Sequence, residues 1–422
     1  MTVAMTACEK LMSRASGRAV HAGDFVTVKP DRIAVHDGNR PIVTDVLTEL
    51  GFSRPFDPER VAIVLDHGVP TPNAAYANVQ RRLRKFATDH DIRLFEQGDG
   101  ISHLVLAEAG LVKPGDVVLA SDSHTTTLGA LHCLATGVGA TDAAAAMATG
   151  EIWLRVPGSV LVELTGELQS GVSARDVAFE LLRSGGTSFA RYRAIEFVGS
   201  GVAGLDMDAR CTLTNLAIEL GAKFGIMPYD AVLEEWLSAL GIDGVDAVEA
   251  DPDATFERSV SIDLGNLKPL VAFPHNPSNV RPVAEAASTR VDLGFIGTCT
   301  NGRIEDLRSA AAVLRGKRLA PGRRLIVVPG SRQTYLAALH EGIIDVFVEA
   351  GAIVSASGCG PCAGVQGGIA GDDENVIATG PRNFRGRMGN PNANVFLASP
   401  ATVAASVVAG NIVSAAEIGD LA

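Results

Sequence analysis

The chain has 422 residues, of which 47% are hydrophobic and 20% charged, and this size allows about two to four globular domains. Its formal net charge of −12 counts against nucleic acid and anionic membranes as partners, because both repel an acidic surface. The apolar runs are too short for a membrane span, and the first residues do not form a signal peptide. We therefore expect a cytoplasmic protein.

Short apolar runs alternate along the chain with longer amphipathic stretches. The runs predict buried strands at Val61–Leu65, Val117–Ala120, Val160–Leu164, Leu293–Ile296, Leu325–Val328, Ala352–Ser355 and Val395–Ala398. The stretches predict helices at Asn73–Asp89, Gly129–Thr149, Ala174–Ser184, Leu213–Phe224, Ile304–Leu314, Thr334–His340 and Ala401–Gly410. Apolar strands separated by helices are typical of parallel sheets covered on both faces, so the pattern predicts an α/β fold.

Two changes in composition suggest domain boundaries. Residues 251–282 are rich in proline, aspartate and asparagine and lack a strong helical period, which places a boundary near the end of this segment. A second boundary is expected near Pro157. The predicted domains are residues 1–157, 158–285 and 286–422.

Polar motifs stand directly after four of the apolar runs. Asp66-His67 follows VAIVL, Asp122-Ser123-His124 follows VVLAS, the Cys299 motif TCTN follows LGFIG, and GCGPC follows AIVSAS. In open parallel sheets, ligands bind outside the carboxyl ends of the strands. We therefore expect several sheets to direct these motifs at one shared cleft.

The chain has six cysteines, too few for a disulfide scaffold of this length. Cys299 stands in one glycine-flanked loop, and Cys359 and Cys362 form a C-x-x-C pair in another. Thiols from two such loops can bind one metal centre. Zinc is the rival metal, but a structural zinc site normally needs a fourth protein ligand, whereas an iron–sulfur cluster on three cysteines leaves one iron open for catalysis. We expect small core positions for the other three, Cys8, Cys133 and Cys211.

Histidines and carboxylates occur together in these motifs. Pairing an imidazole with a carboxylate, as in Asp66-His67 and Asp122-x-His124, raises its basicity and fixes its tautomer, which suits a proton donor. His103 is expected to begin a helix leading into the same unit, and Asn215 and Glu219, four residues apart, are expected to share one helical face.

Three arginines, Arg382, Arg385 and Arg387, precede the last predicted strand, and guanidinium groups bind carboxylates with two parallel hydrogen bonds. A competing motif is the G-x-G-x-x-G at Gly199–Gly204, which follows the strand-like run Ala194–Val198 and would suit a nucleotide-binding dehydrogenase. Residues 205–210 stand before the next predicted helix, so this interpretation is weaker.

The motifs together resemble a known family. LDHGVPTPN, SDSHTTTLGA, GTCTNGRIEDLR, GCGPCAG and RNFRGRMG, in this order, are similar to the large subunit in the isopropylmalate isomerase and homoaconitase branch of the aconitase superfamily. The resemblance extends over nearly the whole chain. It implies three α/β/α domains around a shared cleft, without the swivelling fourth domain, which a separate small subunit would supply.

The resemblance also implies a [4Fe-4S] cluster on Cys299, Cys359 and Cys362, with Asn301 beside it. In the family's scheme His103 with Asp122 protonates the departing hydroxide. The other implied site residues are the pairs Asp66–His67 and His124–Glu219, then Ser123, and, for substrate binding, Asn215, Arg382 and Arg387. The small subunit would carry the serine base that removes the substrate proton, so this chain alone is expected to be nearly inactive.

Three departures concern the substrate rather than the reaction class. Pro381 stands where many relatives have asparagine, the segment His36–Arg40 matches the early family motif only loosely, and CGPCAG is closer to the homoaconitase type. The expected function is a hydro-lyase acting on a 2-hydroxy di- or tricarboxylate. 3-Isopropylmalate is the favoured substrate, and homoaconitate, methylmalate and dimethylmalate are alternatives. A remote alternative is a non-enzymatic, iron-responsive binding protein.

Overall fold

The computed structural model describes residues 3–39 and 42–419, so Arg40 lies outside the described residues. Within these ranges the strands are Phe25–Val28 (β1), Arg32–His36 (β2), Val61–Val64 (β3), Arg93–Phe95 (β4), Val117–Ala120 (β5), Leu134–Gly137 (β6), Ile152–Arg155 (β7), Ser159–Thr165 (β8), Ala194–Val198 (β9), Phe224–Ile226 (β10), Arg258–Asp263 (β11), Leu270–Ala272 (β12), Val280–Pro282 (β13), Leu293–Ile296 (β14), Arg324–Val327 (β15), Ile353–Val354 (β16), Asn375–Ala378 (β17) and Asn394–Leu397 (β18).

The helices lie between these strands. They are Ala7–Ser16 (α1), Val43–Glu49 (α2), Ala74–Asp89 (α3), Ser102–Glu108 (α4), Ala140–Thr149 (α5), Ala174–Gly185 (α6), Ser200–Ala203 (α7), Met207–Leu216 (α8), Ala231–Ser238 (α9), Thr298–Asn301 (α10), Ile304–Leu314 (α11), Arg332–His340 (α12), Ile343–Ala350 (α13) and Pro400–Ala409 (α14). Two 3-10 helices matter for the site, Ser123–Leu131 (η2) and Gly360–Ala363 (η6). Among the described residues none of the helices has the length and apolarity to cross a membrane.

Three larger sheets carry the fold, and β1 and β7 form a separate two-stranded antiparallel sheet. The first has the order β4-β3-β2-β5-β6 and is parallel throughout. The second, β10-β9-β8-β11, is also parallel. The third has the order β13-β12-β18-β17-β14-β15-β16, and only its β12 and β13 run antiparallel to their neighbours. The predicted α/β class is confirmed.

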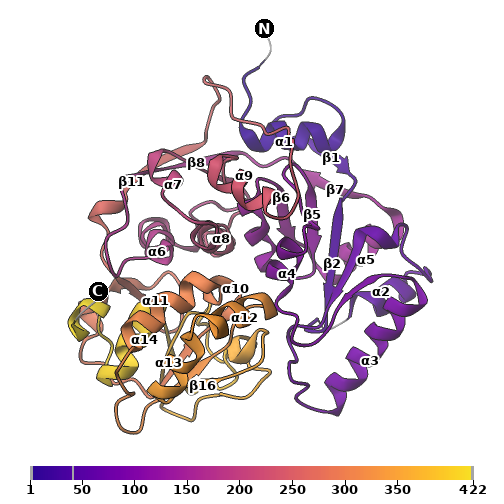
Figure 1. The fold of residues 1–422 in the computed structure, drawn as a ribbon. Helices are drawn as coiled ribbons and strands as arrows, with labels where there is room; N and C mark the ends of the chain where they lie inside the picture. Colours follow the sequence, from indigo (N-terminus) through magenta and orange to yellow (C-terminus); the bar gives the residue numbers. More distant parts are fainter. Residues whose placement is uncertain (1–2, 40–41, 420–422) are drawn as a thin grey trace.

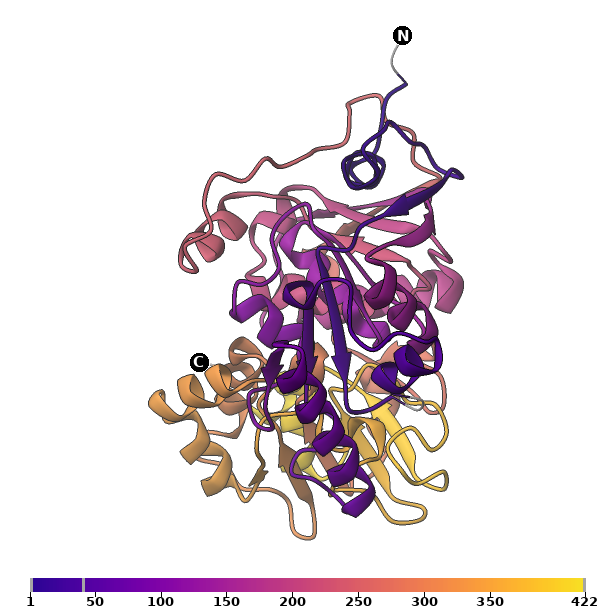
Figure 2. The same cartoon turned by 90° about the vertical axis from the view of Figure 1, so that its right-hand side faces the viewer.

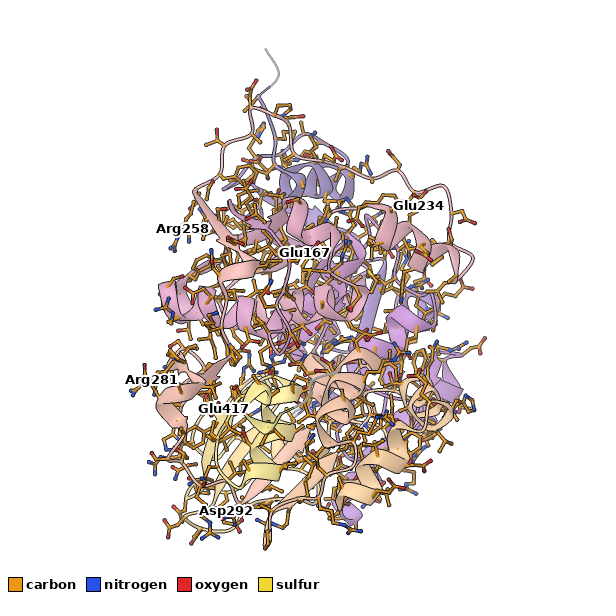
Figure 3. All side chains as sticks on the ribbon, turned by 60° about the vertical axis from the view of Figure 1, so that its left-hand side comes forward. Glu167, Glu234, Arg258, Arg281, Asp292 and Glu417 are labelled. Atoms are coloured by element: carbon orange, nitrogen blue, oxygen red, sulfur yellow. The ribbon has the colours of Figure 1, made fainter. Side chains whose placement is uncertain are left out.

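The three sheets occupy three regions of the molecule. In Figure 1 the first lies among the indigo and purple segments at the right, the second at the upper left and the third, orange to yellow, at the lower left. Figure 2 shows the third region below the second, with the N-terminal end of the chain at the top. Exposed arginines such as Arg258 and Arg281 lie at the edge of the molecule in Figure 3, while the strands inside are mostly buried and apolar.

All seven predicted strands form, two of them with the predicted bounds, because each contains β-branched residues that favour strands. Most are buried, and the edge strand β16 is the exception. Five of the seven predicted helices also form, with their ends within two residues of the expected positions. The start of α3 is fixed by Asn73, whose side chain accepts a hydrogen bond from the backbone N–H of Tyr76.

Two helix predictions are wrong in part. Residues 129–149 contain the end of η2, the strand β6 and only then α5. The helix expected over 213–224 begins earlier, at Met207, ends at Leu216 and is followed by a turn and β10. In both cases alanine and leucine gave a helical period, but Gly137 and Gly225 lie where a Cβ atom would meet neighbouring atoms at 2.5 and 2.9 Å, so these segments pack as strands.

The division of the chain at residues 157 and 285 stays a proposal. All strands of the first sheet precede residue 157, and all strands of the second sheet follow it. However, β12 and β13 precede residue 285 and pair within the third sheet. A boundary drawn from strand pairing alone would therefore fall before Leu270.

Candidate active site

The first sheet brings histidines and carboxylates to one edge. His36 is the last residue of β2, Asp66 and His67 follow β3, and Asp122 follows β5 and caps η2. Because β2, β3 and β5 are parallel neighbours, their carboxyl ends lie on the same side of the sheet. Three segments that are distant in sequence therefore deliver their polar side chains to one place.

Asp66 and His67 form a tight, buried pair. Nδ1 of His67 lies 2.6 Å from Oδ1 of Asp66, and the second oxygen of Asp66 accepts the backbone N–H of Ser102. Burial disfavours the charged imidazole, but the charges of Asp66, Asp122 and Asp37 outweigh it and raise the pKa of His67 to about 9. His67 is therefore an imidazolium at neutral pH, with its Nε2 edge 3.8 Å from Asp122.

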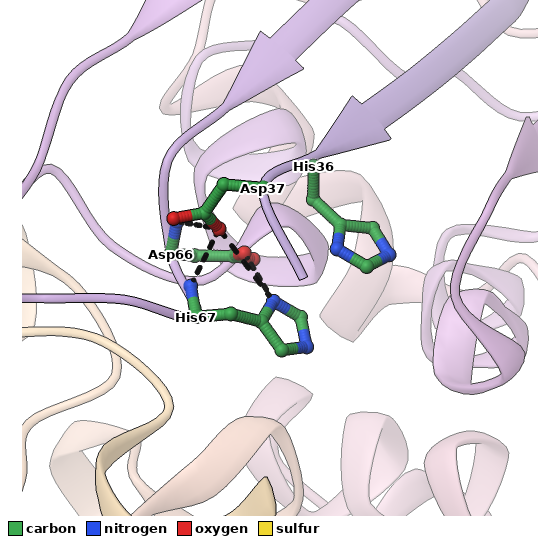
Figure 4. A group of neighbouring side chains, drawn as sticks. All are labelled: His36, Asp37, Asp66 and His67. Carbon is green, nitrogen blue, oxygen red and sulfur yellow. Dashed lines mark hydrogen bonds and ion pairs between the residues drawn. The ribbon is translucent and has the colours of Figure 1, made fainter. Parts of the chain in front are cut away.

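His36 and Asp37 support this pair and did not stand out in the sequence (Figure 4). The ring of His36 stacks on His67 at 4.4 Å, donates to the carbonyl of Ser121 and accepts from the N–H of Gly38, which fixes a neutral tautomer. Burial and the adjacent His67 lower the pKa of His36. The only signal was their position directly after an apolar run, IAV, in the loosely matching early motif.

The four side chains His36, Asp37, Asp66 and His67 offer ligand atoms that lie within 4.8 Å of one another. Their atoms are nevertheless already engaged. The carboxylate of Asp37 accepts the backbone N–H groups of Asp66, His67 and Gly68 and the amide of Gln80. We interpret this group as a frame that orients His67 and not as a metal site.

Asp122 joins two further histidines. Its Oδ1 accepts from Nε2 of His103 at 3.0 Å and from the backbone N–H of His124 at 2.7 Å. Although burial acts in the opposite direction, these hydrogen bonds and the nearby imidazoles hold the pKa of Asp122 well below its ordinary value. As predicted, His103 lies at the start of α4. Ser123 is half-buried, with its hydroxyl 3.5 Å from Nδ1 of His124.

Glu219 connects the histidines with an arginine from the third sheet. Its Oε1 accepts from Nε2 of His124 at 3.0 Å and from Nε of Arg382 at 2.7 Å. The predicted shared helical face with Asn215 is wrong, because α8 ends at Leu216 and Glu219 lies in the following turn. The two residues still face the same region of the molecule, since Asn215 contacts Cys299.

The third sheet supplies the three cysteines from its own strand ends. Cys299 follows β14 in α10, and Cys359 and Cys362 follow β16 at η6. The turn before Cys299 requires Gly297, which has a φ of 154° and a Cα position where a Cβ would lie 2.7 Å from the carbonyl of Val328. The backbone N–H of Cys359 donates to the carbonyl of Asp66, so the cysteine loop lies directly against the first sheet.

All three cysteines are buried, with 8, 9 and 8% of their surface exposed. Burial, then the charges of Asp122 and of Cys362, raise the pKa of the Cys299 thiol to about 12, and burial with the charge of Asp66 raises that of Cys359. Two donors approach the sulfurs: the amide of Asn215 lies 3.2 Å from Cys299, and a guanidinium nitrogen of Arg387 lies 3.8 Å from Cys362. Such a group of thiols and donors suits a bound cation or cluster that stabilises the thiolates.

The spacing of the sulfurs favours a cluster over a single zinc ion. Sulfur ligands of one tetrahedral zinc lie about 3.8 Å apart, given a Zn–S bond of about 2.3 Å. Within the described parts of the chain, the cysteines do not belong to a group of three ligand atoms that all lie within 4.8 Å of one another. The three thiols are close enough to interact electrostatically but too far apart to bind one ion together. This arrangement fits an iron–sulfur cluster.

The remaining predicted residues occupy three kinds of position. Nε of Arg387 is buried and has no hydrogen-bond partner among the described residues, so it can receive a substrate carboxylate. Arg385 is exposed. Asn215 and Asn301 do not face open space, because their amides bind neighbouring side chains: Asn215 binds Thr127 and Thr300, and Asn301 binds Arg175 and Asp306.

The chain is similar to known proteins over nearly its whole length. The model of the aconitase family (aconitate hydratase) matches residues 9–290 and 284–410. The chain belongs to the aconitase family. It is 44% identical to the 3-isopropylmalate dehydratase large subunit 1 of Thermotoga maritima, over 96% of this chain and 98% of the relative. It is also 44% identical to the 3-isopropylmalate dehydratase large subunit of Aquifex aeolicus, over 98% of both chains.

A solved structure shows the same fold at much lower identity. The crystal structure of Thermococcus kodakaraensis aconitase X superposes with a TM-score of 0.52 and covers 89% of each chain at 13% identity. The aconitase-like fold predicted from the sequence is thus confirmed. The G-x-G-x-x-G motif forms the turn after β9 and the four-residue helix α7, far too short for the long phosphate-binding helix of a dinucleotide site.

The His67–Asp66 pair gives a first testable prediction. Replacing Asp66 with Asn should lower the pKa of His67 from about 9 towards its ordinary value of 6.5, because the neighbouring charge that favours the imidazolium is lost. Titration of labelled histidine side chains by NMR measures this, with the His67 signal assigned by its loss in His67→Gln. An unchanged pKa in Asp66→Asn would contradict the pairing.

The same pair links stability to pH. Since the pKa of His67 is higher in the folded chain than in the unfolded one, its contribution is fully present below pH 6.5 and is lost as the pH rises through about 9. The difference between wild type and Asp66→Asn in the free energy of unfolding should therefore shrink over this range.

Proposed function

We propose that the chain is the large subunit of a 3-isopropylmalate dehydratase, a hydro-lyase that removes and re-adds water on a 2-hydroxy dicarboxylate through a cis-alkene. The observation that carries the proposal is that polar residues at the strand ends of the first sheet lie against those at the strand ends of the third sheet. The first sheet contributes histidine–carboxylate pairs, and the third contributes three buried cysteines and two arginines. Relatives of that name match the chain at 44% identity over nearly its full length.

Cys299, Cys359 and Cys362 would hold a [4Fe-4S] cluster. When bound, such a cluster supplies a Lewis acid for the substrate hydroxyl. The chain's own part is to keep the thiols buried, to donate to their sulfurs from Asn215 and Arg387, and to seal the cysteine loop against Asp66. Burial excludes water, which strengthens every electrostatic contact in the site.

Substrate carboxylates would be bound by Arg382 and Arg387. Arg382 is already oriented by Glu219, which uses one oxygen for Arg382 and His124 together. The other nitrogens of its guanidinium have no hydrogen-bond partner among the described residues and would bind a ligand. In a chain with a net charge of −12, Arg382 and Arg387, the second of them 3.8 Å from Cys362, would supply the positive charge that a dianion needs.

Protons would be handled by the histidine pairs. The proposed acid is His103 in its protonated form, which gives the proton on Nε2, through the Asp122 carboxylate that this nitrogen contacts, to the departing hydroxide, so that the ring ends neutral and the hydroxide leaves as water. His67, charged at neutral pH, stabilises the negative charge of the carboxylate groups nearby. Reversal of these steps adds water to the alkene again.

A separate small subunit completes the proposed enzyme. Both of these relatives are named as large subunits. We infer that the partner supplies the swivelling domain and the serine base for the C–H proton, and that the complex works in the cytoplasm.

The proposal is tested by anaerobic reconstitution of the chain with candidate small subunits. The alkene intermediate should accumulate from 3-isopropylmalate, while the chain alone should be nearly inactive. Homoaconitate, methylmalate and dimethylmalate serve as competing substrates in the same assay. Turnover of one of these in preference to 3-isopropylmalate would correct the substrate, and no turnover of any by a cluster-loaded complex would contradict the function.

A further inference from the structure

Arg175 is a fully buried cation that stands outside the sequence motifs. It is the second residue of α6, in the region of the second sheet, and 0% of its surface is exposed. Burial lowers the pKa of its guanidinium to about 10, so it stays charged at neutral pH. A buried guanidinium is strongly unfavourable unless its N–H groups are hydrogen-bonded. The partners of Arg175 therefore indicate its structural role.

The partners all belong to the third sheet's site loops. Nε donates to Oδ1 of Asn301 at 2.7 Å, two residues after Cys299. Nη1 donates to the carbonyl of Gly380 at 2.9 Å, and Nη2 donates to the carbonyl of Thr379. One planar group thus holds both the loop of Cys299 and the loop that leads into Arg382.

The two loops have other contacts in the same place. The hydroxyl of Thr379 bonds to the N–H and the carbonyl of Gly297, and the hydroxyl of Thr298 donates to the carbonyl of Thr379. The side-chain nitrogen of Asn301, Nδ2, donates to Asp306 and Thr212. The guanidinium lies over the ring of Phe179 at 5.4 Å, so its plane is fixed from below by its own helix.

The helix that carries Arg175 is itself held to the third sheet. Asp176 closes a capping box with Ser173 and accepts the backbone N–H of Leu270 at 2.8 Å, at the start of β12. The position of the guanidinium is therefore determined from both sides before any ligand binds.

We propose that Arg175 is the positioning residue that fixes the cysteine loop of residues 297–302 and the arginine loop of residues 379–387 relative to each other. The inference rests on the proposed function in one respect, that Cys299 binds a cluster. Among the described residues Arg175 makes no hydrogen bond to a cysteine, although its charge acts on Cys299 and Cys362, and it does not reach open space, so it is not a catalytic residue. Its effect is to keep the ligand Cys299 and the carboxylate-binding Arg382 in register.

Lysine cannot replace Arg175 in this role. The three donors of the guanidinium lie in one plane and diverge towards an amide oxygen and two carbonyls, whereas an ammonium group is a single point at the end of a flexible chain. Arg175→Lys therefore keeps the charge but loses part of the clamp, which separates positioning from charge alone.

Arg210 provides a matched control. It is also 0% exposed, and its guanidinium is also fully used, by Asp230 and the carbonyls of Val202 and Leu205, but these partners lie outside the cysteine and arginine loops. Arg210→Lys should lower the thermal stability as much as Arg175→Lys without the specific effect on the cluster.

The experiment compares wild type, Arg175→Lys, Arg175→Met and Arg210→Lys after anaerobic reconstitution, measuring iron and sulfide per chain and the rate of iron loss to a chelator. Removing an outer-shell partner typically costs about 10- to 100-fold in metal affinity, so Arg175→Lys should lose iron faster by about that factor, while Arg210→Lys should match wild type. With the small subunit present, Arg175→Lys should also raise KM more than it lowers kcat.

Equal iron retention in Arg175→Lys and wild type, or equally fast loss in Arg210→Lys, would overturn the inference. Arg175→Lys keeps the test decisive even if Arg175→Met does not fold. If wild type itself takes up no cluster, the proposed function fails instead, so the two outcomes are distinguishable.

Discussion

Cys359→Ser is expected to abolish the cluster and, with it, the hydro-lyase activity, while the chain stays folded. The iron and sulfide content after reconstitution should fall from about four of each per chain in the wild type to a small fraction of that in the variant. The serine hydroxyl is nearly isosteric but is a poor ligand for iron beside two thiolates, since it does not ionise in a buried site. Iron and sulfide analysis, with the visible spectrum and thermal unfolding, gives the measurement.

Cys133→Ser is the matched control. Cys133 is 0% exposed, and its thiol donates to the carbonyl of Leu128, a bond that a hydroxyl can keep. Its sulfur belongs to the core below the first sheet, so iron content should be unchanged. Zinc in the wild type, or cluster binding that survives in Cys359→Ser, would contradict the cofactor assignment.

The sequence anticipated the parts of the site that follow apolar strands. Asp66, Asp122 and Cys299 lie where the end of a parallel strand must place them, because strand periodicity and glycine-rich turns are local properties. Residue types that pair across such ends, carboxylate with imidazole, could also be predicted. The distances between the two sheets could not, since they depend on how separate layers pack.

The supporting residues were missed for a physical reason. Arg175 lies in an ordinary amphipathic helix, and its function is set by partners more than 120 positions away, Asn301 and the 379–380 carbonyls. His36 and Asp37 have the same strand-end position as Asp66, but they sit in a motif that matches the family poorly. Glu219 was placed on a helix because small apolar neighbours imitate a helical period, although tertiary packing ends α8 three residues earlier.

Asp122→Asn is expected to lower kcat by about 10²- to 10⁴-fold, the range typical of losing a positioned acid or base. The carboxylate accepts from His103 and from the backbone of His124, and its charge also helps to raise the pKa of His67. An amide of the same shape keeps one acceptor but removes the charge, so His103 loses the partner that supports its proton transfer. Iron content must be measured alongside kcat in the reconstituted complex.

Asp116 supplies the control from the other end of the same strand. It precedes β5, at the opposite end of this strand from Asp122, and accepts the backbone N–H of Lys113, so Asp116→Asn should leave kcat near the wild-type value. The two aspartates lie at opposite ends of β5. A lower kcat in Asp122→Asn than in Asp116→Asn would therefore show that the reaction takes place at the carboxyl end of this strand. A near wild-type kcat in Asp122→Asn would contradict the acid–base role of Asp122. A fall in the iron content of Asp122→Asn would also contradict it, because the loss of activity would then come from the loss of the cluster.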